Sequence, residues 1–251
     1  MPVVKIDDLK KEYIMGTISV AALNGVSLTI EKGEFVSILG PSGSGISTLM
    51  NLLGCRDTPT SGKIEIGGVE ISKMSSCELA HIRNKKIGFI FQSFNLLPNV
   101  TAIANVTLPL LYNSAFPKDK RKAKAAELLK TVGLENRIMH KPNELSGGQR
   151  QRVAIARALI NEPEIILADE PTGNIDSKSG MEIMALLQNL NQKGITIILV
   201  THDENIAQHT DKIIYIKDGK ILQTDIVTNK KFADDEIAQQ EGTIGQLVNS
   251  Q

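Results

Sequence analysis

The sequence predicts an α/β fold with a core of parallel strands and helices, an N-terminal antiparallel β subdomain and an inserted helical subdomain. Three observations predict it. Short apolar strand segments occur in both halves of the chain, a glycine-rich loop joins one of them to a helix, and a middle region rich in helix formers separates the two halves. A length of 251 residues suits one such domain with an insert, or two small domains.

The N-terminal region has strand composition. Val3–Ile6, Val26–Ile30 and Phe35–Leu39 are rich in β-branched and apolar residues. Lys63–Ile71 alternates apolar and polar residues on both sides of Gly67-Gly68, which predicts a hairpin. A helical run, Thr48–Leu53, follows the glycine-rich loop.

Helices are predicted for the middle of the chain. Lys118–Val132 is rich in Lys, Ala, Leu and Glu, and it ends at Gly133. Val153–Ile160 is predicted as a second helix. We therefore expect an inserted helical subdomain that covers residues 93–160.

The α/β pattern returns after Glu164. Ile165–Ala168 and Thr196–Val200 are almost entirely apolar, as is typical of parallel strands buried on both faces, and Met181–Leu190 forms the helix between them. Lys212–Ile216 and Lys220–Gln223 flank Asp218-Gly219, which favours a type I′ hairpin. We divide the chain into residues 1–92 (β subdomain and first part of the core), 93–160 (helical subdomain), 161–227 (second part of the core) and 228–251 (a polar tail with at most a short helix).

Composition narrows the function classes. The formal net charge is +0, so there is no electrostatic argument for nucleic acid or an anionic membrane as the main partner. No run of about 18 apolar residues exists to span a bilayer, and we see no signal peptide. Cys55 and Cys77 lack metal or redox spacing, and we expect reduced thiols in a cytosolic protein.

A phosphate-binding loop is the first candidate site. In such a loop, glycines let backbone N–H groups converge on phosphate oxygens, and the N-terminus of the next helix adds positive potential. Ser47 is placed to offer its hydroxyl to Mg²⁺. The preceding strand and following helix favour this function over a simple surface loop. The segment reads Gly40-Pro41-Ser42-Gly43-Ser44-Gly45-Ile46-Ser47-Thr48.

Ile46 stands where the phosphate-loop motif has a lysine. That lysine donates to the β- and γ-phosphates, and each lost charge-assisted hydrogen bond is worth about 1.5–3 kcal/mol. We expect the Ile46 side chain to lie beside the phosphates and outside the hydrophobic core. Two origins fit, a single replacement in an otherwise active ATPase or a naturally degenerate subunit, and the intact remaining motifs favour the first.

Two acids follow a predicted buried strand. Asp169 and Glu170 end the run that begins at Ile165, and ligand sites of open α/β sheets lie at such strand ends. Asp169 is predicted to hold Mg²⁺, and Glu170 to orient or polarise the attacking water. A solvated acidic strand end would be the better interpretation if no phosphate loop preceded it.

The order of these motifs resembles the ATPases of ABC transporters from Tyr13 to about Leu222, and Leu145–Gln149 matches the signature motif of that family. The resemblance implies an ABC ATPase with a P-loop NTPase core that binds ATP and Mg²⁺. It also implies a head-to-tail homodimer with ATP at the interface. Ser146, which is placed to cap a helix, would bind the γ-phosphate held by the opposite subunit together with Gly147, Gly148 and Gln149.

The same resemblance assigns the remaining site residues. Gln92 matches the glutamine that reaches Mg²⁺ and the water, and His202 matches the histidine that contacts the γ-phosphate. Asp176 lies in the segment that connects the two nucleotide sites. Tyr13 matches the aromatic residue that stacks on adenine, although an N-terminal Tyr is as often simply packed.

Two stretches, Gly88–Pro98 and Ala168–Asn174, resemble the lipoprotein-releasing and macrolide-exporter group. That resemblance implies a cytoplasmic subunit on the inner face of the membrane, which drives a separate integral membrane permease. We expect the permease to dock around Phe94–Val106, where an apolar stretch fits a partner interface or, alternatively, buried core. A second hypothesis is a scaffold that binds ATP without turnover, which Ile46 supports. An ABC ATPase acting on DNA or ribosomes is a weaker third.

Overall fold

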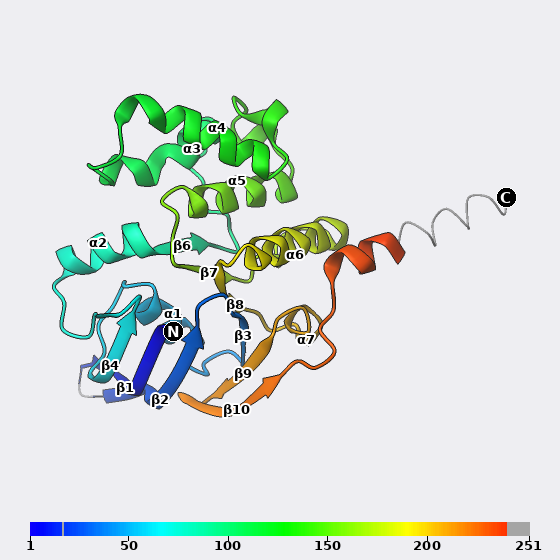
Figure 1. Cartoon of the computed structure of the whole chain (residues 1–251). Coiled ribbons are helices and arrows are strands. Elements are labelled where there is room, and N and C mark those ends of the chain that lie inside the picture. The colour runs from blue at the N-terminus through cyan, green and yellow to red at the C-terminus, as the bar shows by residue number, and fades with distance from the viewer. Residues whose placement is uncertain (17, 240–251) are drawn as a thin grey trace.

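The computed structural model describes residues 1–16 and 18–239, which form two β-sheets surrounded by helices (Figure 1). The strands are β1 (Pro2–Met15), β2 (Ile18–Glu31), β3 (Phe35–Leu39), β4 (Ser61–Ile66), β5 (Val69–Glu70), β6 (Ile87–Ile90), β7 (Ile165–Asp169), β8 (Thr196–Val200), β9 (Lys212–Lys217) and β10 (Lys220–Ile226). The α-helices are α1 (Ile46–Leu53), α2 (Ser76–Lys86), α3 (Ala102–Thr107), α4 (Arg121–Thr131), α5 (Gly147–Leu159), α6 (Ser177–Gln192) and α7 (Glu204–Ala207). Short 3₁₀ turns are η1 (Leu108–Tyr112), η2 (Lys118–Lys120), η3 (Glu135–Arg137) and η4 (Pro142–Glu144).

The larger sheet has six strands in the order β10-β9-β3-β8-β7-β6. Neighbouring strands from β9 to β6 run parallel, and β10 pairs antiparallel at the edge. Ile165–Ala168 of β7 and every residue of β8 are buried, which confirms the interpretation of these apolar runs as strands covered on both faces. Every residue of β3 is buried as well. The β9–β10 turn has positive φ at Asp218 (49°) and Gly219 (72°), as a type I′ hairpin requires.

The smaller sheet is antiparallel, in the order β2-β1-β4-β5. The predicted hairpin around Gly67-Gly68 is formed by β4 and β5. The first strand is longer than its sequence predicts, because β1 continues past Ile6 as far as Met15 and pairs with β2 along this length. The charged residues Lys10, Lys11 and Glu12 interrupt the alternation of apolar and polar residues, so the sequence pattern does not predict this part of the strand. Backbone pairing with β2 forms it instead.

Most of the predicted helices are present with shifted ends, and α2, α3 and α7 were not predicted individually. The helix expected from Val153 begins at Gly147, because Ser146 caps it, and the helix expected from Met181 begins at Ser177, after the cap Asp176. Helix α2 was not predicted. Its signal in the sequence is a capping box, in which Ser75 and Glu78 bind each other's backbone N–H groups.

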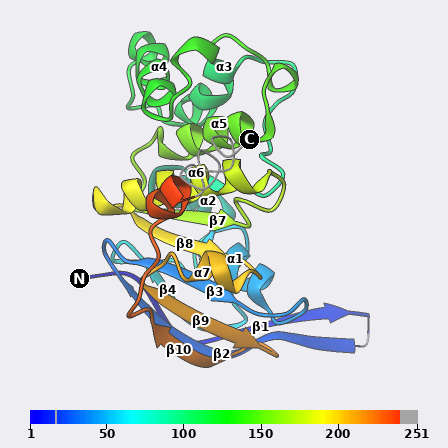
Figure 2. The same ribbon diagram turned by 90° about the vertical axis from the view of Figure 1, so that its right-hand side faces the viewer.

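Two hydrophobic clusters pack on opposite faces of the larger sheet. Residues of β8 alternate between them, with Ile198 and Val200 in the cluster shared with α1, and Ile197 and Leu199 in the cluster shared with α5 and α6. Helices α1 and α5 therefore lie on opposite faces. In Figures 1 and 2, α3, α4 and α5 gather at one end of the molecule and the antiparallel sheet at the other.

The C-terminal part of the described chain leaves the edge hairpin and ends in a helical segment, residues 233–239. The rest of the predicted polar tail, residues 240–251, lies outside the described residues. Among the helices that the structure describes, none combines the length and apolar character needed to cross a membrane.

Candidate functional site

Four neighbouring parallel strands end at the same edge of the larger sheet, and each delivers a predicted site residue there. The phosphate loop follows β3, and His202 follows β8. Asp169 ends β7, Glu170 comes directly after it, and Gln92 follows β6. The sheet order β3-β8-β7-β6 thus places these groups side by side, although 162 residues separate Gly40 from His202 in the sequence.

The β9–β10 turn forms a backbone hydrogen bond with the phosphate loop. The N–H of Gly219 donates to the Ser44 carbonyl at 2.9 Å, and the Ser44 N–H donates to the Pro41 carbonyl at 3.1 Å. Gly45 has a φ of 99°, and a Cβ on it would lie 2.4 Å from the Ala22 carbonyl oxygen. Only glycine fits there, because the conformation is left-handed and the neighbouring backbone is too close for a side chain.

Three features of the loop fit a bound phosphate. Helix α1 begins after Gly45 without a side-chain cap, so its first N–H groups have no side-chain acceptor among residues 1–16 and 18–239. The Ser44 hydroxyl is buried and has no hydrogen-bond partner within the described part of the chain. A Cβ on Gly43 would meet no atom within 4 Å, so open space lies beside the loop. By contrast, α2, α5 and α6 each have a side-chain cap. These groups suit a phosphate at the α1 N-terminus.

The position of Ile46 corrects one expectation. The sequence predicts that its side chain lies outside the core, but Ile46 is only 9% exposed and belongs to the cluster that contains Leu23 and Leu49. Its Cδ1 lies 3.0 Å from the point where a Cβ on Gly40 would be. An apolar side chain avoids solvent and turns toward the core, since it has nothing to gain from an anionic site. The loop therefore has its backbone cradle but no cation at this position.

Glu170 and His202 form a close pair at the sheet edge. His202 Nδ1 lies 2.5 Å from Glu170 Oε1, and the Glu170 N–H donates to the Val200 carbonyl of the adjacent strand at 2.9 Å. Glu170 has a φ of 43°, an uncommon conformation for a residue with a side chain. The hydrogen bond to Glu170 and its negative charge raise the pKa of the exposed His202 imidazole.

Asp169 lies next to Ser47 across a small cavity of about 80 Å³, which Arg56, Phe89 and Phe91 also line. Desolvation of its carboxyl group and the charge of Glu170 raise the pKa of Asp169, and Arg56 acts in the opposite direction. One carboxylate and one hydroxyl suit Mg²⁺, which usually takes few protein ligands and completes its shell with water and nucleotide phosphates. The described residues accordingly contain no cluster of three His, Cys, Asp or Glu side chains able to hold a metal alone.

Gln92 lies where β6 ends, next to the loop that follows β7. A Cβ on Gly173 would lie 2.6 Å from Gln92 Nε2 and 3.3 Å from Glu170 Oε2, so the Gln92 amide and the Glu170 carboxylate converge there. Asn174 Nδ2 donates to the Gln92 carbonyl at 3.1 Å. Gln92 is thereby brought beside Glu170, which the sequence alone could not establish.

Sequence reasoning missed two α5 residues, the buried Gln151 and the half-buried Arg157, which hold the loops after β7 and β6. Gln151 Nε2 donates to the Pro171 carbonyl at 2.8 Å, and Arg157 donates to the carbonyls of Phe94 and Asn95 at 2.8 and 2.5 Å. Phe94 and Asn95 both have positive φ, so Arg157 fixes a strained segment. Both residues belong to α5, and only their position after the signature motif hints at this role.

The signature residues start α5 on the opposite face of the sheet from α1. Ser146 Oγ accepts from the Gln149 N–H at 3.2 Å, and Gln149 Oε1 accepts from the Ser146 N–H at 3.0 Å, which confirms the predicted cap. Asp176 caps α6, with its Oδ1 accepting from the Ser179 N–H at 2.9 Å. The structure does not bring the signature to the phosphate loop of the same chain.

Tyr13 lies near the tip of the β1–β2 ribbon and is 37% exposed. Its hydroxyl donates to Asp57 Oδ2 at 3.0 Å, and Lys11 Nζ lies 5.0 Å from its ring centroid. The ring is therefore anchored at its hydroxyl end and partly open to solvent, so it is available for stacking.

Comparison with known proteins agrees with this architecture. The family described as ABC transporter matches residues 23–173. An uncharacterized ABC transporter ATP-binding protein of Thermotoga maritima is 52% identical over 87% of this chain and 93% of its own length. The macrolide export ATP-binding/permease protein MacB of Vibrio parahaemolyticus is 51% identical over 91% of this chain, which spans only 36% of that longer relative.

Solved structures show the same likeness. The ATP-binding cassette MJ0796, whose sequence is that of an uncharacterized ABC transporter ATP-binding protein of Methanocaldococcus jannaschii, has been determined as a dimer bound to ADP and Pi. That structure has a TM-score of 0.82 and 49% identity, and the match covers 90% of this chain and 99% of that one. The predicted fold class is confirmed.

The contact between Glu170 and His202 predicts a specific titration. We expect the imidazole of His202 to titrate above the ordinary value of 6.5, and Glu170→Gln to move its pKa back down, because the substitution removes the negative charge that favours the imidazolium. NMR titration of the histidine side chains measures both values. An identical His202 titration in both proteins would contradict the pairing.

Proposed function

Because this chain belongs to the ABC transporter family, we propose that it is the ATP-hydrolysing subunit of a membrane export or extraction complex. One observation carries the proposal. A single sheet edge joins a phosphate cradle, a paired Glu170 and His202, and the Gln92 side chain, which together suit nucleotide phosphates and an attacking water. Family membership makes the chain an ABC-type ATPase.

Each part of the site has a distinct role in this proposal. Residues 40–48 hold the β- and γ-phosphates through backbone N–H groups and the free Ser44 hydroxyl. Glu170 orients the attacking water and accepts its proton, while His202 contacts the γ-phosphate. Tyr13 stacks on the adenine, and its hydrogen bond to Asp57 holds the ring in place.

Mg²⁺ is proposed to bind with the nucleotide, through Ser47, Asp169 and Gln92. When bound, it supplies positive charge that offsets the charge on the phosphate oxygens during transfer. Ser47 and Asp169 line the same small cavity, and Gln92 reaches toward Glu170 from the next strand, so all three approach from the phosphate side of the sheet edge.

Ile46 is proposed to impair turnover. The backbone cradle is complete without it, but the cation that stabilises the transferring phosphoryl group is missing, and the Ile46 side chain packs in the core. The loss affects the transition state more than the ground state, because negative charge on the phosphate oxygens must be neutralised as the bond breaks. ATP binding is therefore expected to persist at lower affinity.

We expect Ile46→Lys to raise the rate of ATP hydrolysis by about tenfold or more, since even one restored charge-assisted hydrogen bond is worth about 1.5–3 kcal/mol. Phosphate release, measured with the membrane partner present, gives both rates. Ile46→Met is the matched control, because it adds length without charge, and it is expected to leave the slow rate unchanged. Equal rates for the parent chain and its Ile46→Lys variant would show that another cation already supplies this charge.

The buried position of Ile46 predicts opposite effects on stability and ligand response. Without nucleotide, Ile46→Lys is expected to lower the melting temperature by a few degrees, because about 1–2 kcal/mol of apolar burial is lost. With Mg·ATP, the lysine variant is expected to gain more stability than the parent, through tighter binding. Thermal unfolding with and without Mg·ATP measures both. A parent that melts well below the variant without nucleotide would contradict the packing of Ile46.

A homodimer with two ATP molecules at its interface is the proposed working unit. The signature residues 146–149 and the phosphate loop lie on opposite faces of the sheet of one chain, so one nucleotide contacts both only if a second subunit supplies the signature. A two-fold axis makes the two sites equivalent. The dimeric MJ0796 structures support this arrangement.

ATP should hold this dimer together when hydrolysis is blocked. In the Ile46→Lys background, Glu170→Gln is expected to trap an ATP-bound dimer, because the nucleotide stays intact between the subunits. Adding Ser146→Arg is expected to abolish that dimer, since the larger side chain fills the proposed phosphate site. Light scattering with ATP measures both masses. A monomeric Glu170→Gln variant, or a dimer that survives Ser146→Arg, would refute the arrangement.

The proposed partner is an integral membrane permease subunit, so the chain would be cytoplasmic and bound to the inner face of the membrane. The MacB relatives, of which this chain spans about a third, support such a partner because their names combine ATP-binding and permease functions. The predicted docking region Phe94–Val106 is only partly surface. Ala102, Asn105 and Val106 are buried, whereas Leu97 is 48% exposed.

A non-hydrolysing scaffold is the second candidate, and Ile46 is the observation that favours it. Such a subunit would bind ATP and its membrane partner through the same surfaces but would not release phosphate. The hydrolysis assay above separates the two, because a scaffold stays inactive even after Ile46→Lys, whereas an ATPase with one missing cation recovers.

A further inference from the structure

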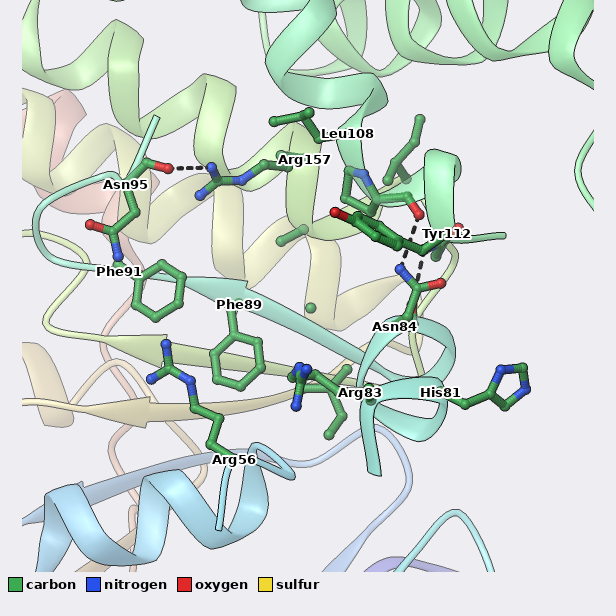
Figure 3. A pocket seen from close by; sticks show the side chains of 17 residues that line it. Arg56, His81, Arg83, Asn84, Phe89, Phe91, Asn95, Leu108, Tyr112 and Arg157 are labelled. Carbon is green, nitrogen blue, oxygen red and sulfur yellow. Dashed lines mark hydrogen bonds between the residues drawn. The ribbon is translucent and has the colours of Figure 1, made fainter. Parts of the chain in front are cut away.

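A wide pocket of about 760 Å³ lies between α2, β6, η1 and α5 (Figure 3). Apolar side chains from β6 and η1 make up much of its wall, including Phe89, Phe91 and Leu108, and Tyr112 is exposed at its rim. It lies beside the start of the predicted docking region, to which it is joined by Asn95.

The charges in this pocket are all of one sign. Arg56, Arg83 and Arg157 line it, and none of its lining residues within the described chain is an aspartate or glutamate. Across residues 1–16 and 18–239 these arginines form no ion pair with a carboxylate. Instead, Arg83 donates to the Cys55 carbonyl and Arg157 to the carbonyls of Phe94 and Asn95. Apolar walls with guanidinium groups that have no carboxylate partner among the described residues fit an apolar segment that carries a carboxylate.

Arg56 also faces the nucleotide site. It follows the C-terminal end of α1, and its guanidinium carbon lies 5.2 and 5.1 Å from the ring centroids of Phe89 and Phe91. The same side chain lines the small cavity that contains Ser47 and Asp169. Of the three pocket arginines, Arg56 alone lines both spaces in the part of the chain that the structure describes, so it connects them.

We propose that Arg56 links the wide pocket to the metal end of the nucleotide site: a carboxylate of the permease segment that occupies the pocket pairs with Arg56 and removes a positive charge that opposes Mg²⁺ beside Asp169. The inference rests on the proposed function, because it names a contact and a regulatory effect of the same nucleotide site. It assigns the pocket a carboxylate-bearing apolar segment as its occupant.

The direction of the effect follows from the charges. An arginine that lines the same cavity as Asp169 repels a divalent cation bound at that carboxylate, and the Phe89 and Phe91 rings hold the guanidinium in range. A carboxylate in the pocket neutralises Arg56 or draws it outward, and either change favours Mg²⁺. Docking would then strengthen Mg·ATP binding without any change in the phosphate loop itself.

The first test measures the Mg²⁺ concentration that gives half of the maximal binding of a fluorescent ATP analogue to the full chain. Arg56→Met keeps an unbranched apolar stem over the two rings and removes the charge, so it should lower this midpoint by about threefold or more. Arg56→Lys keeps the charge and should leave the midpoint near that of the parent. Lys85→Met removes an exposed charge of α2 outside both cavities and controls for general electrostatics.

The second test supplies the carboxylate. We would add 3-phenylpropionate, an apolar ring with one carboxylate, and compare it with 3-phenylpropionamide, its neutral counterpart. The acid should lower the Mg²⁺ midpoint of the parent chain and not that of Arg56→Met, and the amide should have no effect on either. Saturation-transfer NMR reports whether each compound binds.

Each outcome decides the inference. If Arg56→Met leaves the Mg²⁺ midpoint unchanged, or if Lys85→Met lowers it equally, the proposed link is wrong. ATP binding itself, and with it the proposed function, would be unaffected by that result. An acid that does not bind, or that acts equally on Arg56→Met, overturns the assignment of the pocket to a carboxylate. If the ATP analogue fails to bind both with Mg²⁺ and with EDTA, the proposed function fails and the inference fails with it.

Discussion

The parallel pairing of β3, β8, β7 and β6 is the constraint on which the rest of the structure depends. Strands β3 and β8 are completely buried and β7 is buried as far as Ala168, so their backbone groups must pair with each other and their ends must align at one edge. At that edge the strands end and loops begin, and the loops can carry polar side chains because they are not packed inside the core. The phosphate loop, Glu170, His202 and Gln92 meet there because sheet order, not sequence distance, decides which residues are neighbours.

Ile46 shows how one position can serve the core and the site at once. The first residue of α1 can direct its side chain toward the phosphates or toward the cluster beneath the loop, and isoleucine lies in that cluster. The residue that packs in the core beneath the loop thus stands at the position where the motif has its lysine. Arg56, three residues beyond the C-terminal end of the same helix, brings positive charge to the cavity that contains Ser47 and Asp169. Ile46 at the start of α1 and Arg56 after its end therefore both affect the positive charge near a bound nucleotide.

Residue patterns in the sequence predicted the parts of this protein that depend on local chemistry. The buried strands, the Gly67-Gly68 and Asp218-Gly219 hairpins and the Ser146 cap all follow from periodicity or turn residues, and the structure confirms them. The missed features depend on contacts between distant segments. The length of β1 comes from pairing with β2, the burial of Ile46 from the packing below the loop, and the roles of Gln151 and Arg157 from carbonyls far along the chain. Helix α2 is the exception, because its capping box of Ser75 and Glu78 is a local sequence pattern that could have predicted it.

The central claim is that one nucleotide occupies the sheet edge, with its phosphates on the α1 N-terminus. A structure of this chain crystallised with Mg²⁺ and a non-hydrolysable ATP analogue tests it most directly. We expect a phosphate oxygen within hydrogen-bond distance of the Ser44 hydroxyl, which is buried and has no partner among the described residues, and we expect the Ile46 side chain still in the core. Phosphates bound away from residues 40–48, or a Ser44 hydroxyl that remains without a partner, would contradict it.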